Sequence, residues 1–361
     1  MQKTGADISA QTGREQIVYQ LDALREAVPQ TLELVSNSVL QGRLLEWDLP
    51  PKRDMVQDDI QTYGSDPEFV LGELLHSTAY GKKTLGRSLI CPSHQVEKIT
   101  AADVVQYMNS LYVPNRMTLV ATNFDHKDLT ILADRLFGHL DNDVSSIAPL
   151  PTTAKESAKY IGGDFEVSAV LEGPEGTATQ AILAFEGASQ KNLKQQYALT
   201  VLAQLLGNGS NIYVSSLPRG ESLLQRHVVS KQQQIRHARA FATSYSDSGL
   251  FGVFVQAANG NAASSAIVST VDLLKNAAEQ ITESQLTAAK NATLLQFLTG
   301  LETNQGLNEF NAKLVSQDEH IAAIKKLTAD DIKQAAKKLL ASKPTLVSVG
   351  NLDGMIRTAD L

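Results

Sequence analysis

The sequence has few of the patterns that would indicate a disulfide framework, a membrane span or a targeting segment. Its single cysteine, Cys91, excludes an internal disulfide framework and any metal site built from cysteines. No apolar run approaches the roughly 20 residues that a helix needs to cross a bilayer. Residues 1–15 contain neither the apolar core of a signal peptide nor the Arg-rich amphipathic face of a transit peptide. Any membrane association is therefore expected to run through partners.

Strong positive charge is also missing. The chain has 39 acidic and 32 basic residues, a net charge of −7, and this mild acidity argues against a dedicated nucleic-acid surface. Hydrophobic residues make up 43% of the 361 residues and charged residues 20%, which is typical of a globular protein and not of a disordered one. This length suits two domains of ordinary size.

Local catalytic and metal-binding motifs are absent as well. The sequence contains no H-E-x-x-H, H-x-x-E-H, Gly-Lys-Ser/Thr or Gly-x-Ser-x-Gly motif. No two of its histidines lie within one helical turn of each other, so no local zinc pair exists. The histidines are His76, His94, His126, His139, His227, His237 and His320. Each is expected to be structural or solvated. We therefore predict no catalytic, cofactor-binding or metal-binding residues and no cofactor.

Two further features of the sequence resemble binding sites, but each has an ordinary structural interpretation. Asp58 and Asp59 are adjacent on an expected helix, so they point in different directions, and a solvated acidic face is the favoured interpretation over a metal ligand. The run Gly207-Asn-Gly-Ser210 follows an expected helix instead of opening one, so it lacks the helix N-terminal amides of a phosphate site.

The chain does contain a long-period repeat. Residues 98–123 and 326–351 both pass from a Thr-x-x-Asp helix start, through an amphipathic stretch, into an apolar run that ends in Asn. Thr100 matches Thr328, and the run 118–120 matches 345–347. Glu46 and Glu283 form a third match and Val18 and Val253 a fourth, all in the same order and about 230 residues apart.

These matches predict an α+β chain of two homologous α/β halves. The first half covers residues 1–141, a polar segment with two prolines at 142–163 is the linker, and the second half covers 164–361. Compared with the second half, the first is expected to be truncated, because it lacks counterparts to the opening strands and first helix.

Hydrophobic periodicity predicts the individual elements. Expected strands cover residues 17–21, 117–121, 180–188, 238–245, 250–257 and 345–347. Expected helices cover residues 28–40, 53–61, 68–77, 100–112, 128–140, 192–206, 262–278, 282–298 and 328–340. Capping boxes are expected at Thr100, where Asp103 follows three residues later, and at Thr282.

An ordered series of short motifs resembles a known family. The series is Arg14-Glu15-Gln16-x-Val18-Tyr19, Lys52-Arg53-Asp54-x-Val56, Asp66-Pro67, Leu85-Gly86-Arg87-Ser88, Tyr112-x-x-x-Arg116-Met117 and Tyr245-Ser-Asp-Ser-Gly-Leu-Phe-Gly252. It is similar to the inverted-zincin peptidase superfamily, which includes the mitochondrial processing peptidase and the core proteins of the ubiquinol–cytochrome c reductase complex. The series covers nearly the whole chain.

The resemblance implies a non-catalytic core subunit of respiratory complex III. Active family members carry H-x-x-E-H and a third ligand, a Glu, and Asp59 stands about where that Glu would be. The resemblance further implies core protein 1 and other complex III subunits as partners. It implies a peripheral location on the matrix side of the mitochondrial inner membrane.

Two alternatives stay open at this stage. The chain could be a zinc metallopeptidase of the processing-peptidase type, or the non-catalytic subunit of one, whose metal-binding segment is missing from the sequence. Residues 206–220 lack the Gly-Gly-Gly-Gly run of that helper subunit, which favours the core-protein interpretation. The second alternative is a truncated product that cannot assemble.

Overall fold

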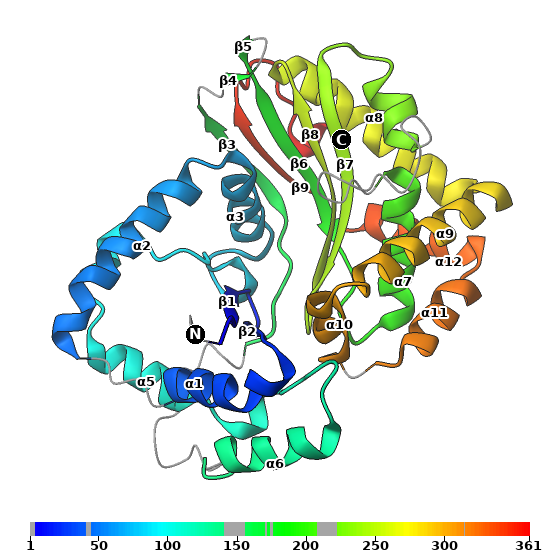
Figure 1. Ribbon diagram of the computed structural model, residues 1–361. Helices are drawn as coiled ribbons and strands as arrows, with labels where there is room; N and C mark the ends of the chain where they lie inside the picture. Colours follow the sequence, from blue (N-terminus) through cyan, green and yellow to red (C-terminus); the bar gives the residue numbers. More distant parts are fainter. Residues whose placement is uncertain are drawn as a thin grey trace. The chain divides into compact units, whose positions relative to one another are not determined.

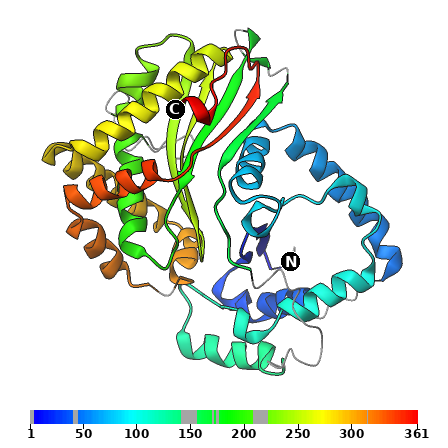
Figure 2. The ribbon, with the colours of Figure 1, turned by 180° about the vertical axis from the view of Figure 1, so that it is seen from behind.

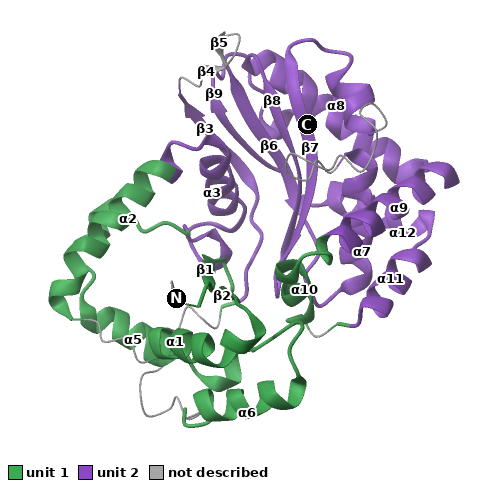
Figure 3. Ribbon diagram, in the orientation of Figure 1, with its two compact units in different colours: residues 1–62, 89–156, 300–315 green, residues 63–88, 157–299, 316–361 purple. Residues whose placement is uncertain are grey.

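The computed structural model describes residues 4–40, 45–140, 156–169, 172–173, 176–207, 222–313 and 315–361. These residues form two compact units, which are coloured separately in Figure 3 and are treated one at a time. Unit 1 comprises residues 1–62, 89–156 and 300–315, and unit 2 comprises residues 63–88, 157–299 and 316–361.

Unit 2 is built on a five-stranded mixed sheet (Figure 1). Its strands are β3 (Gly163–Ser168), β6 (Thr179–Glu186), β7 (Ile235–Ser244), β8 (Gly249–Ala257) and β9 (Thr345–Gly350). They lie in the order β3-β9-β6-β8-β7, with β3 and β9 parallel and the other pairs antiparallel. A separate short ladder joins β4 (Glu172–Gly173) to β5 (Gly176–Thr177).

Helices cover both faces of this sheet (Figures 1 and 2). One face is packed by α7 (Leu193–Leu206), α8 (Gly260–Glu279) and α12 (Ala329–Ala341), and the other by α3 (Pro67–Tyr80). Side chains alternate along β6, so Leu183 joins the first core and its neighbour Ile182 the second. Burial on both faces explains why β6 is a continuous apolar run and not an alternating one.

The remaining elements of unit 2 extend its helical layer. They are α9 (Glu283–Gly300), α11 (Gln317–Lys326), a 3-10 turn at Thr84–Gly86 and a π-helical turn at Gln225–Val229. α11 packs against α7. Sequence periodicity did not predict α11, nor did it predict α10 (Asn304–Asn311) of unit 1.

Unit 1 is a set of helices beside one β-hairpin. Its hairpin joins β1 (Asp7–Thr12) to β2 (Ile17–Asp22) antiparallel, and β1 was not predicted. Its other helices are α1 (Val28–Leu40), α2 (Leu49–Gly64), which runs two residues into unit 2, α4 (Ser93–Val96), α5 (Ala101–Leu111) and α6 (His126–Phe137). The buried cluster between α1 and α6 contains Leu32, Leu132 and Leu136, and Leu21, Phe124 and Phe137 pack against it.

The two copies of the repeated helix start have the same geometry. In one, the Thr100 and Asp103 side chains each accept a hydrogen bond from the other residue's backbone N–H, at 3.2 and 2.9 Å. In the other, Thr328 and Asp331 do the same at 3.3 and 2.9 Å. The predicted capping box at Thr282 is also formed, with Gln285. Reciprocal bonds of this kind satisfy backbone donors that the first helical turn leaves free.

The predicted strand at residues 117–121 is wrong. Met117 has extended dihedral angles, with φ −108° and ψ 143°, but residues 117–121 pair with no strand in the part of the chain that the structure describes. Its repeat partner, β9, lies between β3 and β6. The same kind of sequence therefore forms a ladder only where neighbouring strands are present to accept it.

The compact units do not follow the predicted halves of the chain. Residues 63–88, from the first predicted half, belong to unit 2 because Leu71, Leu75 and Ala79 of α3 are buried on its sheet. Most of the predicted linker, residues 142–155, lies outside the described residues, and residue 163 already begins β3. The two halves therefore remain a prediction about how parts of the sequence are related to each other. The two units describe how the folded chain packs.

Replacing Asp331 with Asn tests whether the ionised carboxylate contributes to the α12 helix start. Lys194 Nζ lies 2.7 Å from Asp331 Oδ1. The hydrogen bond from Lys194, followed by that from the Thr328 N–H, lowers the pKa of Asp331 below its ordinary value of 3.8. A lowered folded-state pKa stabilises the protein above pH 3.8, and this stabilisation is lost as the pH falls through the folded-state value.

We expect Asp331→Asn to lower the free energy of unfolding at neutral pH by roughly 0.5 kcal/mol, as for an exposed ion pair. The difference from the parent chain should begin to fall near pH 3.8 and vanish once the pH is below the lowered folded-state pKa, as measured by urea denaturation at a series of pH values. Asp103→Asn is the matched control, because Thr100 alone supplies the hydrogen bonds that lower the pKa of Asp103. A loss for Asp331→Asn that does not change with pH would contradict this account.

Candidate functional site

The structure gathers no metal site from the described residues. All seven histidines lie among these residues, and no group of three or more His, Cys, Asp or Glu side chains in this part of the chain could hold a metal ion. Cys91 is a free, half-buried thiol.

Two of the histidines pack against protein partners. His76 on α3 places Nδ1 2.7 Å from the Gly72 carbonyl oxygen and Nε2 2.6 Å from the Tyr245 hydroxyl. Both of its ring nitrogens are thus in contact with protein atoms. His320 places Nδ1 3.0 Å from the Tyr197 hydroxyl, and its ring centroid lies 4.1 Å from that of Phe297. Both residues have the structural role expected from the sequence.

His237 lies beside an ion pair. Arg239 Nη2 contacts Glu68 Oε2 at 2.7 Å, and the same guanidinium lies over the Phe254 ring, 5.1 Å from its centroid. His237 is exposed on β7, but desolvation by the side chains around it, followed by the positive charge of Arg239, lowers its pKa. The imidazole is therefore neutral at physiological pH. The remaining histidines, His94, His126, His139 and His227, are exposed.

Asp58 and Asp59 are both exposed on α2, as expected for a solvated acidic face. No cluster that could hold a metal ion includes Asp59 among the described residues. The loop that distinguishes the two sequence alternatives, residues 206–220, lies outside the described residues from Asn208 onward.

The motif Tyr245–Gly252 has a structural role. Its Tyr245 bonds His76 of α3, and its Gly249 carbonyl accepts a hydrogen bond from the Tyr80 hydroxyl at 2.9 Å, with Ser248 Oγ 3.1 Å from the same hydroxyl. We call His76, Tyr80, Tyr245 and Ser248 the hairpin anchor, because they tie the β7–β8 turn to α3. These pairings join residues that are far apart in the chain, so local sequence patterns do not predict them.

Glycine in the Tyr245–Gly252 motif lets the backbone pack closely. A Cβ at Gly249 would stand 2.3 Å from the Ala188 carbonyl oxygen. One at Gly252 would stand 2.6 Å from the Phe241 ring and 2.9 Å from the Leu183 carbonyl oxygen. All three distances are too short for a side-chain atom, so these two glycines are required by packing.

The half-buried Tyr160 extends the hairpin anchor toward the segment that precedes β3. The rings of Tyr80 and Tyr160 meet edge to face at 6.0 Å, and the Tyr160 hydroxyl lies 2.7 Å from Thr345 Oγ1. Burial raises the pKa of Tyr160 to about 12 and raises that of Tyr80 further. Both hydroxyls therefore stay protonated and can donate hydrogen bonds at any physiological pH.

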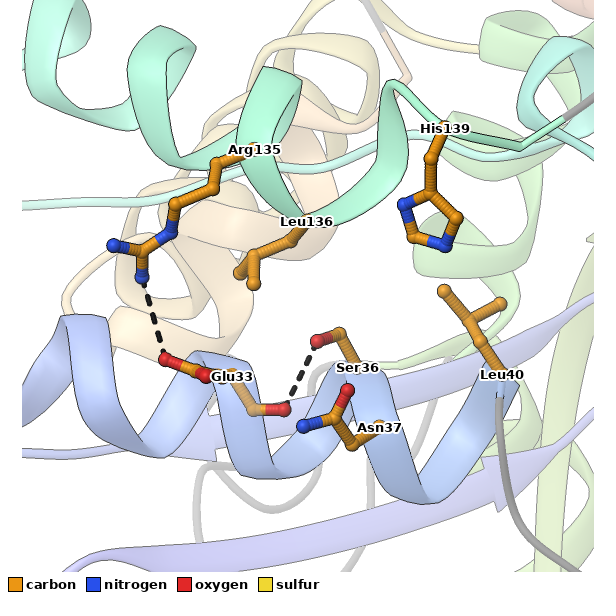
Figure 4. Close-up of a pocket in the computed structure, with 7 residues that line it drawn as sticks. All are labelled: Glu33, Ser36, Asn37, Leu40, Arg135, Leu136 and His139. Carbon is orange, nitrogen blue, oxygen red and sulfur yellow. Dashed lines mark hydrogen bonds and ion pairs between the residues drawn. The ribbon is translucent and has the colours of Figure 1, made fainter.

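A groove of about 440 Å³ lies between α1 and α6 (Figure 4). Its lining residues are Glu33, Ser36, Asn37, Leu40, Arg135, Leu136 and His139. Arg135 and Glu33 form an ion pair at 3.4 Å, and the Ser36 hydroxyl donates to the Glu33 carbonyl oxygen at 3.0 Å. The serine is thus engaged with backbone and is not paired with a base, so the groove has no nucleophile arranged for catalysis.

The sequence is similar to known protein families and to individual relatives. Residues 98–293 match the family model described as "Peptidase M16 inactive domain", and residues 1–93 match "Insulinase (Peptidase family M16)". Mitochondrial-processing peptidase subunit alpha-2 of Dictyostelium discoideum is 30% identical over 357 residues, 97% of this chain and 76% of that protein. Cytochrome b-c1 complex subunit 2 of Rattus norvegicus is 26% identical over 363 residues, 98% of this chain and 76% of that protein.

The fold is shared with solved structures. A chain of complex III2 from Candida albicans, solved with Inz-5 bound, superposes with a TM-score of 0.82 at 16% identity. That match covers 99% of this chain and 84% of the other. It confirms the expected α+β peptidase-like fold.

Tyr80→Phe tests whether the hairpin anchor stabilises unit 2. Removing the hydroxyl takes one hydrogen bond from the Gly249 carbonyl oxygen, which keeps the bond that the Gly187 N–H donates at 2.8 Å, so we expect the free energy of unfolding to fall by about 0.5–1.5 kcal/mol. The midpoint of urea denaturation measures the change. Tyr107→Phe is the matched control because the Tyr107 side chain is 52% exposed. Equal losses in the two variants would show that the Tyr80 hydroxyl makes no special contribution.

Proposed function

The chain belongs to peptidase family M16, and from that membership we propose that it is core protein 2 of respiratory complex III. In this role it is a non-catalytic scaffold subunit that supports the assembly and stability of the electron-transfer complex. It pairs with core protein 1 and contacts other subunits of the complex.

The observation that carries this proposal is the imbalance between the two units. The cluster that joins α1 to α6 in unit 1 contains three buried side chains, those of Leu32, Leu132 and Leu136, whereas unit 2 has two extensive buried cores. Of the twenty large apolar side chains that the described residues expose, thirteen lie in unit 1, among them Trp47 at 73% and Leu24 at 74% exposed. A surface of this kind is typical of an obligate subunit, whose interfaces bury about 2,000 Å² or more.

Two observations support a non-catalytic role. The family model that matches residues 98–293 is described as an inactive domain. Zinc hydrolases need about three protein ligands and an open position. The side chains that could have been ligands are exposed singly or are bonded to protein partners, as His76 is.

The proposed location is the matrix face of the mitochondrial inner membrane. The named relative in rat is a subunit of the cytochrome b-c1 complex. Among the described helices, none is both long and apolar enough to pass through a bilayer. Attachment to the membrane would then come from partner subunits.

A second candidate function rests on a specific observation. The Dictyostelium relative at 30% identity is an alpha subunit of the mitochondrial processing peptidase, and four further alpha subunits match at 26–28% identity. In that role the chain would be the helper of a catalytic beta subunit. The few glycines in residues 206–220 argue against it, because the sequence lacks the helper's polyglycine run.

Native electrophoresis of mild-detergent extracts distinguishes the two roles. We expect the tagged full-length protein, expressed in its own cells, to migrate with a large complex that contains the haems of cytochromes b and c1. That complex should reduce cytochrome c with a quinol, and the rate should not respond to a zinc chelator. Depletion of the protein should lower the amount of assembled complex.

The core-subunit proposal would be contradicted if the protein were recovered in a soluble two-chain complex that cleaves mitochondrial precursors and loses this activity with a chelator. That result would support the processing-peptidase alternative. An untagged strain and a strain carrying tagged unrelated matrix protein control for nonspecific migration.

A further inference from the structure

A small pocket opens among the helices of unit 2. Its volume is about 200 Å³. α7 contributes Leu205 near its last residue, α8 contributes its C-terminal end, and α9 contributes Gln285 from its first turn. All the lining residues belong to unit 2. They are Leu205, Leu223, His227, Leu273, Asn276, Ala277, Gln280 and Gln285.

The floor of the pocket is apolar. Leu205, Leu273 and Ala277 are each at most 9% exposed and belong to the larger core of unit 2. Leu223 is partly buried and packs against the same core. A group that enters the pocket therefore replaces water on apolar surface, which favours an apolar group.

The rim of the pocket is polar, but the described residues that line it include no acid, lysine or arginine. Asn276 and Gln280 are exposed on the face of α8 that also forms the floor. Their side chains make no hydrogen bond to another described residue. Gln285 Oε1 accepts hydrogen bonds from the Thr282 N–H and hydroxyl, both at 3.0 Å. Its Nε2 donors have no partner among the described residues, so three carboxamides can bond to a visitor.

The fourth polar side chain of the rim, that of His227, is presented by a π-helical turn. The turn covers Gln225–Val229, and the exposed imidazole lies between the fully buried Leu224 and Val228. These two buried side chains anchor the turn in the core and so hold the imidazole at the rim. π-helical turns are uncommon, and they are frequently found at functional sites.

The size of the pocket suits one aromatic ring. An apolar cavity of about 150 Å³ is large enough to bind benzene, whereas pockets for drug-sized ligands measure about 300–1,000 Å³. A side-chain carboxamide has both a donor and an acceptor, which match the C=O and N–H of a peptide group. Three carboxamides around an apolar floor therefore fit a ring that is flanked by peptide groups. The uncharged lining matches an uncharged segment.

We infer that this pocket takes an aromatic side chain of a partner polypeptide, whose flanking peptide groups hydrogen-bond to Asn276, Gln280 and Gln285. Aromatic anchors that fill such pockets commonly dominate the affinity of protein–protein interfaces. The inference goes beyond the proposed function, because the pocket lies within unit 2 and does not depend on which assembly contains the chain.

Methyl NMR of the full chain with three small probes tests the inference. N-acetyl-phenylalaninamide has a ring and two peptide groups, N-acetyl-alaninamide has the peptide groups alone, and toluene has the ring alone. The first probe should shift the methyl signals of Leu205, Leu223 and Ala277, and it should leave that of Leu71, in the other core, unchanged.

The relative affinities of the probes separate the floor from the rim. N-acetyl-phenylalaninamide should bind at least about tenfold more tightly than N-acetyl-alaninamide, because only the former buries a ring. It should also bind about fivefold more tightly than toluene, because toluene forms no hydrogen bonds with the carboxamides.

A pair of variants tests the carboxamide rim. Gln280→Glu keeps the size of the side chain but removes its N–H donors, so we expect it to weaken binding of N-acetyl-phenylalaninamide about fivefold. Gln334→Glu makes the same change at an exposed position of α12 that does not line the pocket, and it should leave binding unchanged. The methyl spectrum of each variant without probe shows whether it has folded.

Four results would overturn the inference. The first three are unshifted methyl signals of the lining residues at saturating N-acetyl-phenylalaninamide, equal binding of N-acetyl-alaninamide, and equal effects of the two folded variants. The fourth is toluene binding at least as tightly as N-acetyl-phenylalaninamide, because the pocket would then take free ring compounds and not a polypeptide.

Discussion

The structure depends on one constraint, which is that an interior β-strand needs a hydrogen-bonding neighbour on each side. β6 meets this constraint through β8 and β9, and its alternating side chains then face two helical layers. Because its backbone groups are paired and its side chains buried, the rest of unit 2 can pack around it. In unit 1, the described residues form one hairpin, and the extended segment 117–121 pairs with no described strand.

The position of α3 follows from the same sheet. The helix comes from the first predicted half of the chain, but its apolar face is buried against β6 and β9, and the hairpin anchor fixes it to the β7–β8 turn. The Tyr245–Gly252 motif is therefore explained by packing and hydrogen bonding, without any catalytic role. In the groove between α1 and α6, polar groups are likewise bonded to each other and not arranged as a nucleophile and base.

Local features could be predicted from the sequence, and nonlocal ones could not. The Thr100 and Thr328 capping boxes depend on residues three apart, so their sequences sufficed. The segment 117–121 has strand-like residues, but whether it forms a ladder depends on distant neighbours that its own sequence does not specify. The hairpin anchor was missed for the same reason, since His76 and Tyr245 meet only in the folded chain. Sequence reasoning correctly indicated the family and the α+β fold through ordered motifs and the repeat.

The central claim is that unit 2 is complete on its own whereas unit 1 depends on a partner for its stability. Native-state hydrogen exchange of the full chain without partners, measured at increasing urea, tests this most directly. The account predicts that amides of β6 and β8 exchange only through global unfolding, and that those of β2 and α1 exchange through local opening at a much lower free energy. Equal exchange free energies in the two units would contradict it.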